Sequence, residues 1–93
     1  MTSFASIDRI EGNYAVCEVE LLPFEESKPE DFATKECRMM DISLQDFPYD
    51  IGEVNEVDVF VVEHDGENII KVYYKDAEEK ARRLEVLAKI WRQ

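Results

Sequence analysis

The sequence predicts an α+β fold, a small curled five-stranded antiparallel sheet or barrel with one C-terminal α-helix. Three observations lead to this prediction. The dipeptides Gly12-Asn13 and Asp65-Gly66 each separate two runs of strand-forming residues, as the turns of tight hairpins do. Several of these runs are apolar on both faces, which is expected when a sheet curls around its own core. Residues 76–92 repeat their apolar positions at helical spacing.

The first hairpin joins predicted strands at residues 4–11 and 14–22. Ile7 and Ile10 have opposite parity, so we expect the first strand to carry a bulge between them or to be covered on both faces. The second strand stops before Pro23, because proline cannot donate a hydrogen bond to a strand ladder. Its alternation places on one face Ala15, Cys17, Val19 and Leu21, and on the other face Glu18 and Glu20.

Residues 23–36 form a predicted insert with five acids, two prolines and two phenylalanines, Phe24 and Phe32. The spacing of Ser27 and Glu30 is that of a capping box, which predicts a short helical turn from Pro29. The two phenylalanines either fasten the insert to its own sheet or present an anchor to a partner.

Three more strands are predicted after the insert, at residues 37–44, 57–63 and 68–74. A turn-rich connection at residues 45–55 precedes the fourth strand, which is apolar on both faces as a central strand should be. His64, at a strand end beside the second hairpin turn, is expected to be solvated. The fifth strand is again apolar on two faces, with Ile70, Val72 and Tyr74 on one and Ile69 and Tyr73 on the other.

The C-terminal helix is predicted at residues 76–92, with Asp76 as its N-cap and Glu79 completing a capping box. Ion pairs are expected between residues four positions apart, namely Glu78–Arg82, Glu79–Arg83 and Glu85–Lys89. An apolar stripe runs along one side of the helix and consists of Ala77, Ala81, Leu84, Leu87, Ala88 and Trp91. We expect the large side chains of this stripe to be buried against the sheet, because so short a chain offers no other surface. The helix would then cover one open side of the sheet.

The 93 residues are expected to form one domain, residues 1–93, because a second core would leave neither half enough buried surface. A hydrophobic content of 45% argues against disorder. No apolar run approaches the roughly 20 residues that span a bilayer, and the N-terminus lacks the pattern of a signal peptide. We therefore expect a cytoplasmic protein.

The net charge of −11 is concentrated in the predicted sheet and insert. Residues 76–93 hold four acids and five bases, for a net charge of +1, which leaves −12 for residues 1–75. An acidic body repels both nucleic-acid phosphates and anionic membrane surfaces, so we expect neither as a partner.

The sequence shows no phosphate loop, no zinc-ligand spacing and no recognisable nucleophile–base pair. Cys17 and Cys37 are expected to be small buried hydrophobes, since a zinc site that joined them to His64 would lack a fourth ligand. Asp8 and Arg9 are interpreted as a structural ion pair rather than as catalytic groups. We therefore predict no enzyme activity, no cofactor and no metal.

The segment Asp8-Arg9-Ile10-Glu11-Gly12-Asn13-Tyr14-Ala15-Val16 resembles the opening motif of a family of small prokaryotic proteins, the domain of unknown function numbered three thousand and six. Phe47-Pro48 followed by Gly52-Glu53-Val54 resembles the family's mid-chain turn, and the final helix resembles its tail. Two features depart from the family: Val57-Asp58 stands where the family usually has Gly-Asp, and residues 23–36 look like an extra insert. The resemblance implies an acidic β-rich middle followed by a charged helix, and it implies no activity, because none is established for the family.

The function that these observations favour is that of a small non-enzymatic protein-binding or accessory module. Such a module would recognise a protein partner through a sheet edge, the insert or the helix. The candidate partner-binding residues are Phe24 and Phe32, which lie among acids that could steer a basic partner. The alternatives are a nucleic-acid-binding small barrel, which the acidic charge disfavours, and an enzyme with an unrecognised site. The sequence leaves the oligomeric state open.

Overall fold

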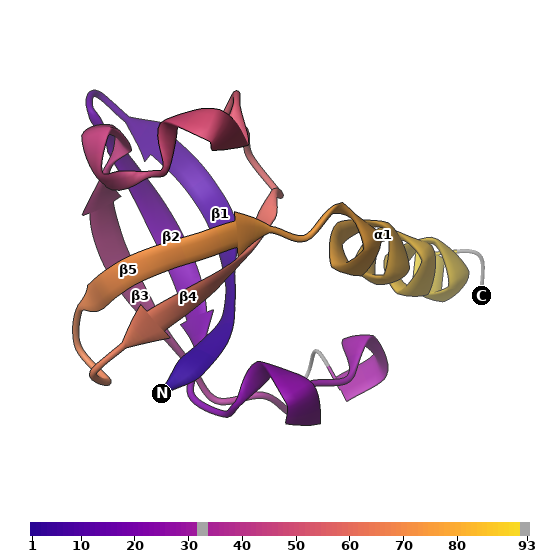
Figure 1. Cartoon of the computed structure of the whole chain (residues 1–93). Helices are drawn as coiled ribbons and strands as arrows, with labels where there is room; N and C mark the ends of the chain where they lie inside the picture. The colour runs from indigo at the N-terminus through magenta and orange to yellow at the C-terminus, as the bar shows by residue number, and fades with distance from the viewer. Residues whose placement is uncertain (32–33, 92–93) are drawn as a thin grey trace.

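A computed structural model describes residues 1–31 and 34–91 and places five antiparallel strands in one sheet, in the order β3-β2-β1-β4-β5 (Figure 1). The elements are β1 (Thr2–Glu11), β2 (Tyr14–Glu20), β3 (Cys37–Ser43), β4 (Val59–His64), β5 (Ile69–Lys75) and α1 (Ala77–Trp91). The predicted α+β fold is confirmed. It is a curled sheet rather than a closed barrel: β5 passes in front of β1 and β2, while β3 and β5 remain the two edges.

The first hairpin forms as its sequence predicts. Gly12 has a φ of +57°, in the left-handed region that favours glycine in tight turns. The pairing of β1 with β2 shifts register between Ile7 and Arg9, so the predicted bulge is confirmed. Because of this bulge, Ile7 and Ile10 both pack against the same core despite their opposite parity.

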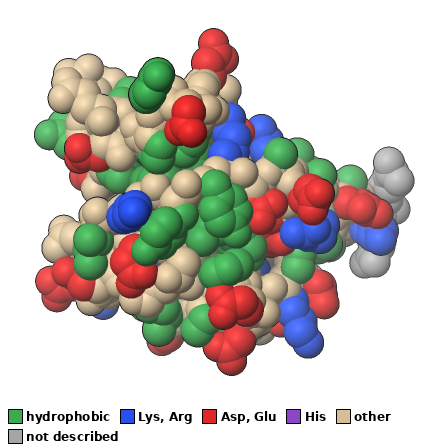
Figure 2. All heavy atoms as spheres, in the orientation of Figure 1, with side chains coloured by type: hydrophobic (Ala, Val, Ile, Leu, Met, Phe, Trp, Pro, Cys, Tyr) green, Lys and Arg blue, Asp and Glu red, His purple; other side chains and the backbone are tan. Residues whose placement is uncertain are grey.

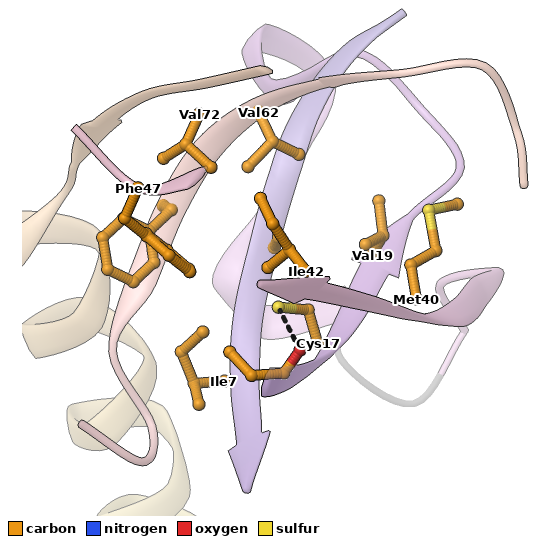
Figure 3. Packing of buried hydrophobic residues seen from close by; sticks show 11 residues of the cluster. Ile7, Cys17, Val19, Met40, Ile42, Phe47, Val62 and Val72 are labelled. Atoms are coloured by element: carbon orange, nitrogen blue, oxygen red, sulfur yellow. Dashed lines mark hydrogen bonds between the residues drawn. The ribbon is translucent and has the colours of Figure 1, made fainter. Parts of the chain in front are cut away.

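The main core fills the inner side of the curl (Figure 3). Phe47, from the connection between η3 (Leu44–Asp46) and η4 (Tyr49–Ile51), packs edge-on against Phe60 of β4 with ring centroids 5.0 Å apart. The other buried members of this core come from all five strands and are Ala5, Ile7, Ala15, Cys17, Val19, Met40, Ile42, Val62 and Val72. The face predicted for β2 is therefore confirmed.

The alternation predicted for the fifth strand is wrong. The pairing of β4 with β5 shifts register twice, between Val61 and Val62 and again between Glu63 and His64. Val72 is buried in the core and Ile69 packs against it, although three positions separate them. Exposed side chains on this strand are Ile70, Tyr73 and Tyr74. A register shift moves the following side chains to the opposite face, which strict alternation cannot anticipate.

The outer face of the sheet carries a second, smaller core of Phe4, Val59 and Val61. The insert covers it through Phe24, whose ring meets that of Phe4 edge-on at 5.6 Å between centroids. Phe24 begins η1 (Phe24–Glu26), and the helical turn predicted from Pro29 is present as η2 (Pro29–Asp31).

The position of α1 differs from the prediction. Asp76 caps the helix, as its Oδ1 accepts a hydrogen bond from the Glu79 amide at 2.9 Å. The helix then runs away from the sheet, and Leu84, Leu87 and Trp91 remain 46%, 40% and 85% exposed (Figure 1). Within α1, Glu79 alone is buried. The helix is attached by buried charged groups at its first turns, so its apolar stripe does not cover the open side of the sheet.

Candidate functional site

A groove separates α1 from the outer face of β1 and β2. It consists of two adjoining cavities of about 260 and 240 Å³. The cavities share four lining residues, Ser6, Glu18, Arg83 and Leu87. The first cavity extends toward Lys35 and Cys37, and the second extends toward Asp8 and Val57. The groove is thus walled by sheet on one side and by helix on the other.

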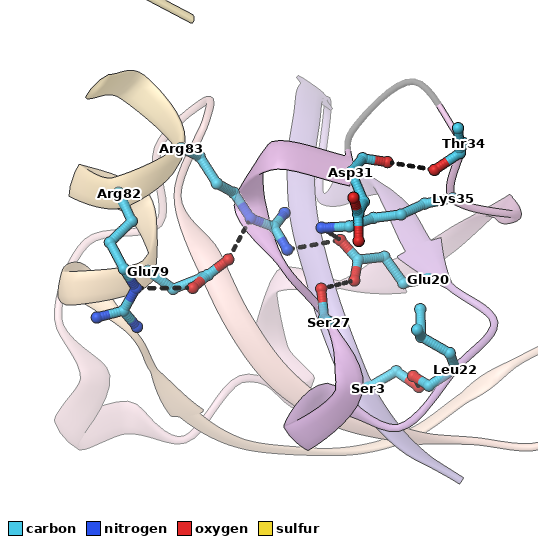
Figure 4. Close-up of polar contacts among 10 residues, drawn as sticks. All are labelled: Ser3, Glu20, Leu22, Ser27, Asp31, Thr34, Lys35, Glu79, Arg82 and Arg83. Atoms are coloured by element: carbon cyan, nitrogen blue, oxygen red, sulfur yellow. Dashed lines mark hydrogen bonds and ion pairs between the residues drawn. The ribbon is translucent and has the colours of Figure 1, made fainter. Parts of the chain in front are cut away.

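Arg83 connects the helix wall of the groove to the sheet wall through two ion pairs (Figure 4). Its Nε donates to Oε2 of Glu79 at 2.8 Å within the helix, and its Nη2 donates to Oε2 of Glu20 on β2. Both carboxylates are buried, with Glu20 4% and Glu79 2% exposed. The guanidinium also lies 5.1 Å from the centroid of the Phe4 ring, a cation–π contact.

Glu20 also holds the insert to the sheet. Its Oε1 accepts a hydrogen bond from the Ser27 hydroxyl at 2.6 Å, and its Oε2 lies 3.3 Å from the Lys35 ammonium. The Ser27 hydroxyl thus donates a hydrogen bond to Glu20 rather than taking part in the predicted capping box with Glu30. The second predicted capping box, between Asp76 and Glu79, is also incomplete. The Glu79 carboxylate pairs with Arg82 and Arg83, and the Asp76 amide donates instead to the carbonyl of Val59. One network thus joins insert, sheet and helix.

A second charged anchor holds the first turn of α1. Asp58, 3% exposed, lies 2.8 Å from the Lys80 ammonium and 3.3 Å from that of Lys75, and its Oδ2 accepts from the Asn55 amide at 2.8 Å. Burial works to raise the pKa of Asp58, but the Lys80 and Lys75 ammonium groups and the Asn55 amide outweigh burial and hold that pKa below its usual value. The carboxylate stays ionised and fixes the helix start.

The outer part of α1 presents an apolar surface beside the groove. Leu84, Leu87, Ile90 and Trp91 are each at least 40% exposed, and Leu84 and Leu87 also line the groove. We call these four side chains together with the groove the α1 surface. Val57, 55% exposed, lies on its opposite rim. All three ion pairs predicted at a spacing of four residues are present, at 3.8, 2.8 and 3.5 Å.

A second group of exposed apolar side chains lies over β5 on the face shown in Figure 2, where α1 carries both acidic and basic side chains. It consists of Ile70, Tyr73 and Tyr74, with the Lys71 ammonium 5.1 Å from the centroid of the Tyr73 ring. This group lies on an edge strand. The α1 surface differs because it combines exposed apolar side chains with a recess.

The predicted site residues that the structure describes lie apart from this surface or beside its rim. Phe24 is half-buried against Phe4, in the arrangement expected of a residue that fastens the insert. Phe32 lies outside the residues that the structure describes. Asp8 pairs with Arg9 at 2.7 Å, as predicted, and Arg9 also pairs with Glu11. Asp8 in addition lines the groove.

His64 is buried, so the prediction that it is solvated is wrong. Its Nδ1 accepts a hydrogen bond from the Gly66 amide at 3.0 Å, which leaves the proton of the neutral ring on Nε2. Nε2 lies 2.8 Å from the Ser3 hydroxyl, which donates to the carbonyl of Leu22 at 2.6 Å. Burial lowers the pKa of His64 and keeps the ring neutral. A ring that donates to serine cannot accept its proton, and both groups are buried, so this pair lacks the arrangement of a nucleophile and its base.

Both cysteines are free thiols. Burial raises the pKa of Cys17 to about 12 and that of Cys37 to about 11, so both stay protonated at neutral pH and are poor nucleophiles. Among the residues that the structure describes, no three His, Cys, Asp or Glu side chains are arranged to hold a metal ion. Across those same ranges, no helix combines the length and apolar character needed to cross a membrane.

No family model, curated protein or solved structure matches this chain. The resemblance of its opening motif to a family of unknown function stays a prediction.

Proposed function

We propose that this chain is a non-enzymatic protein-binding module of the cytoplasm and that it binds its partner at the α1 surface. One observation carries the proposal: Leu84, Leu87, Ile90 and Trp91 are left exposed beside a groove of the same chain. Large contiguous apolar surface is uncommon on a monomer and is typical of sites that bind proteins. The groove supplies the recess and Trp91 the projecting aromatic that such interfaces use as anchors.

The polar contacts around the groove support binding rather than catalysis. Arg83 and Lys80, the two helix cations beside it, are each engaged with a buried carboxylate. Charged groups satisfied in this way hold the helix in position, and they are not available to transfer protons or to bind a cofactor. A cytoplasmic setting fits the two protonated free thiols.

Nucleic acid is disfavoured as a partner because residues 1–75 carry a net charge of −12. The alternative of an enzyme rests on Ser3 and His64, the one hydroxyl–imidazole contact of the described residues. The tautomer of His64 and the burial of both side chains argue against catalysis by this pair. Phe24 is the second candidate contact, although its packing on Phe4 favours a fastening role.

Affinity capture from lysate with matched variants as bait tests the proposal. We expect the wild-type chain and Glu85→Ala, altered on the charged side of α1, to retain the same protein, and Trp91→Ala to lose it while it remains folded and unfolds cooperatively. Trp91 is 85% exposed, so its removal should leave the fold intact. Capture that survives in both Trp91→Ala and Leu87→Glu would contradict the proposed surface. Retention of single-stranded nucleic acid at physiological salt would contradict the proposed class of partner.

The variant Phe24→Ala separates the two roles of that residue. A fastening role predicts a lower melting temperature, whereas an anchor role predicts loss of capture at unchanged stability.

A further inference from the structure

We propose that the partner bound at the α1 surface is a second copy of this chain, and that the two copies pair through antiparallel contact of their α1 helices. The inference rests on the function proposed above and names its partner.

The α1 surface contains both a projecting group and a recess that can receive it. Trp91 projects near the end of the helix, and the recess beside Arg83, of about 240 Å³, is lined by apolar groups that include Val57 and Leu84. Positions 83 and 91 are eight residues apart, or about 12 Å along the helix axis. In an antiparallel pair centred on Leu87, position 91 of each helix lies level with position 83 of the other. Each Trp91 therefore meets the recess of the other copy.

This contact is self-complementary. If Trp91 of one copy enters the recess of the second, the two-fold axis places the second Trp91 in the first recess, and the assembly closes as a dimer. Leu87 lies on the axis, and Leu84 of each helix lies level with Ile90 of the other. The apolar positions 84, 87 and 91 alternate in steps of three and four, which is the spacing that pairs helices side by side.

Charge does not prevent a second copy from binding at this surface. Residues 76–93 have a net charge of +1, whereas the rest of the chain has −12. In the antiparallel pair, the near-neutral helix of one copy lies beside Asp8 and Glu18, the carboxylates at the rim of the other copy's groove. The acidic residues 1–75 of the two copies are not brought together there. The cations of Arg83 and Lys80 line the recess and would lie close to the inserted indole, which favours cation–π contact.

The exposed apolar side chains supply a large part of the area that a dimer needs. A buried aromatic side chain contributes about 150–250 Å², so two Trp91 side chains supply roughly 300–500 Å². Stable interfaces bury about 1,200–2,000 Å² in total. The two sets of Leu84, Leu87, Ile90 and Val57, all at least 40% exposed, add further apolar contact.

Sedimentation equilibrium between about 1 and 300 µM protein tests the dimer directly. We expect the wild-type chain and Glu85→Ala to dimerise with dissociation constants within about threefold of each other, since Glu85 faces away from the apolar positions. Trp91→Ala should raise the dissociation constant at least about 30-fold, as removal of an interface hot spot does. A wild-type chain that stays monomeric throughout, or a dimer that Trp91→Ala leaves unchanged, would overturn the inference.

Cysteine cross-linking tests the antiparallel register, in a Cys37→Ser background that removes the half-buried thiol. Leu87→Cys lies on the proposed axis and should form an interchain disulfide under mild oxidation, whereas Glu85→Cys should not. Equal cross-linking of the two variants would overturn the register.

The lysate capture separates this inference from the function on which it rests. A monomeric chain whose capture of another protein depends on Trp91 would refute self-pairing and leave the protein-binding function standing. A dimer that depends on Trp91 and captures nothing else supports self-pairing as the use of this surface.

Discussion

Arg83 of α1 forms an ion pair with Glu20 of β2 across 63 positions of sequence, and both side chains are largely withdrawn from solvent. This contact, rather than the apolar stripe of the helix, fixes α1 to the sheet. Because the attachment is polar and lies within the first two turns of the helix, the apolar positions that follow remain free. The groove and the exposed stripe both follow from this relationship.

Removal of Arg83 should therefore destabilise the protein strongly. Arg83→Ala leaves Glu20 and Glu79 buried with fewer counter-charges, and breaking a buried ion pair costs about 3–5 kcal/mol. We expect a loss near the lower end of that range in the free energy of unfolding, since Lys35 and Arg82 still contact the two carboxylates. Urea denaturation of the variant and the wild-type chain measures this loss in the free energy of unfolding. The matched control is Lys89→Ala, whose exposed ion pair with Glu85 is worth less than about 0.5 kcal/mol. Similar losses in the two variants would contradict a structural role for Arg83.

The burial of His64 predicts a pH dependence of stability. Burial holds its folded pKa below the ordinary value of 6.5, so the unfolded chain binds more protons once the pH falls below about 6.5. The free energy of unfolding should be constant with respect to this group above that pH, and should fall as the pH falls from about 6.5 toward the folded pKa.

His64 is the sole histidine, so the loss should be absent in His64→Gln between pH 7.5 and 5.5. Denaturation midpoints of the two proteins across this range provide the test. The same slope in both would show that His64 does not titrate differently in the folded state.

Val57 adopts a φ of +62°, which is rare for any residue with a side chain and a genuine outlier for a β-branched one. We expect Val57→Gly to raise the free energy of unfolding by about 0.5–1 kcal/mol. Relief of the left-handed conformation gains about 1–2 kcal/mol, and the extra freedom of glycine in the unfolded chain offsets part of it. Val57→Ala keeps a Cβ at this φ and should change stability little. A glycine variant less stable than the alanine variant would contradict the account.

Local signals in the sequence were sufficient for much of the fold. Gly12 marks its turn, the parity of Ile7 and Ile10 marks the bulge, and charge spacing marks the ion pairs of α1. Each of these features depends on residues that are close together in the chain.

The errors about His64, Glu20 and the helix concern contacts between distant residues. The burial of His64 depends on Ser3, 61 positions away, and nothing near His64 in sequence indicates it. Glu20 occupies the face predicted for it, yet its burial depends on Lys35 and Arg83. The helical stripe shows which side of α1 is apolar, but periodicity alone cannot show what covers that side. The sequence therefore groups Leu84, Leu87 and Trp91 and names the helix among the possible binding features, but it assigns these side chains to the core.

The fluorescence of Trp91 tests the central claim most directly, that the apolar stripe of α1 is uncovered within one copy of the chain. Trp91 is the sole tryptophan, so the intrinsic emission reports on it alone. The spectrum is recorded at a concentration at which the folded protein sediments as a monomer, together with quenching by acrylamide. We predict the emission maximum and the quenching constant of a solvated indole, close to those of the urea-unfolded chain. A blue-shifted, protected emission from the folded monomer would show that the stripe packs against its own sheet, and would contradict the account.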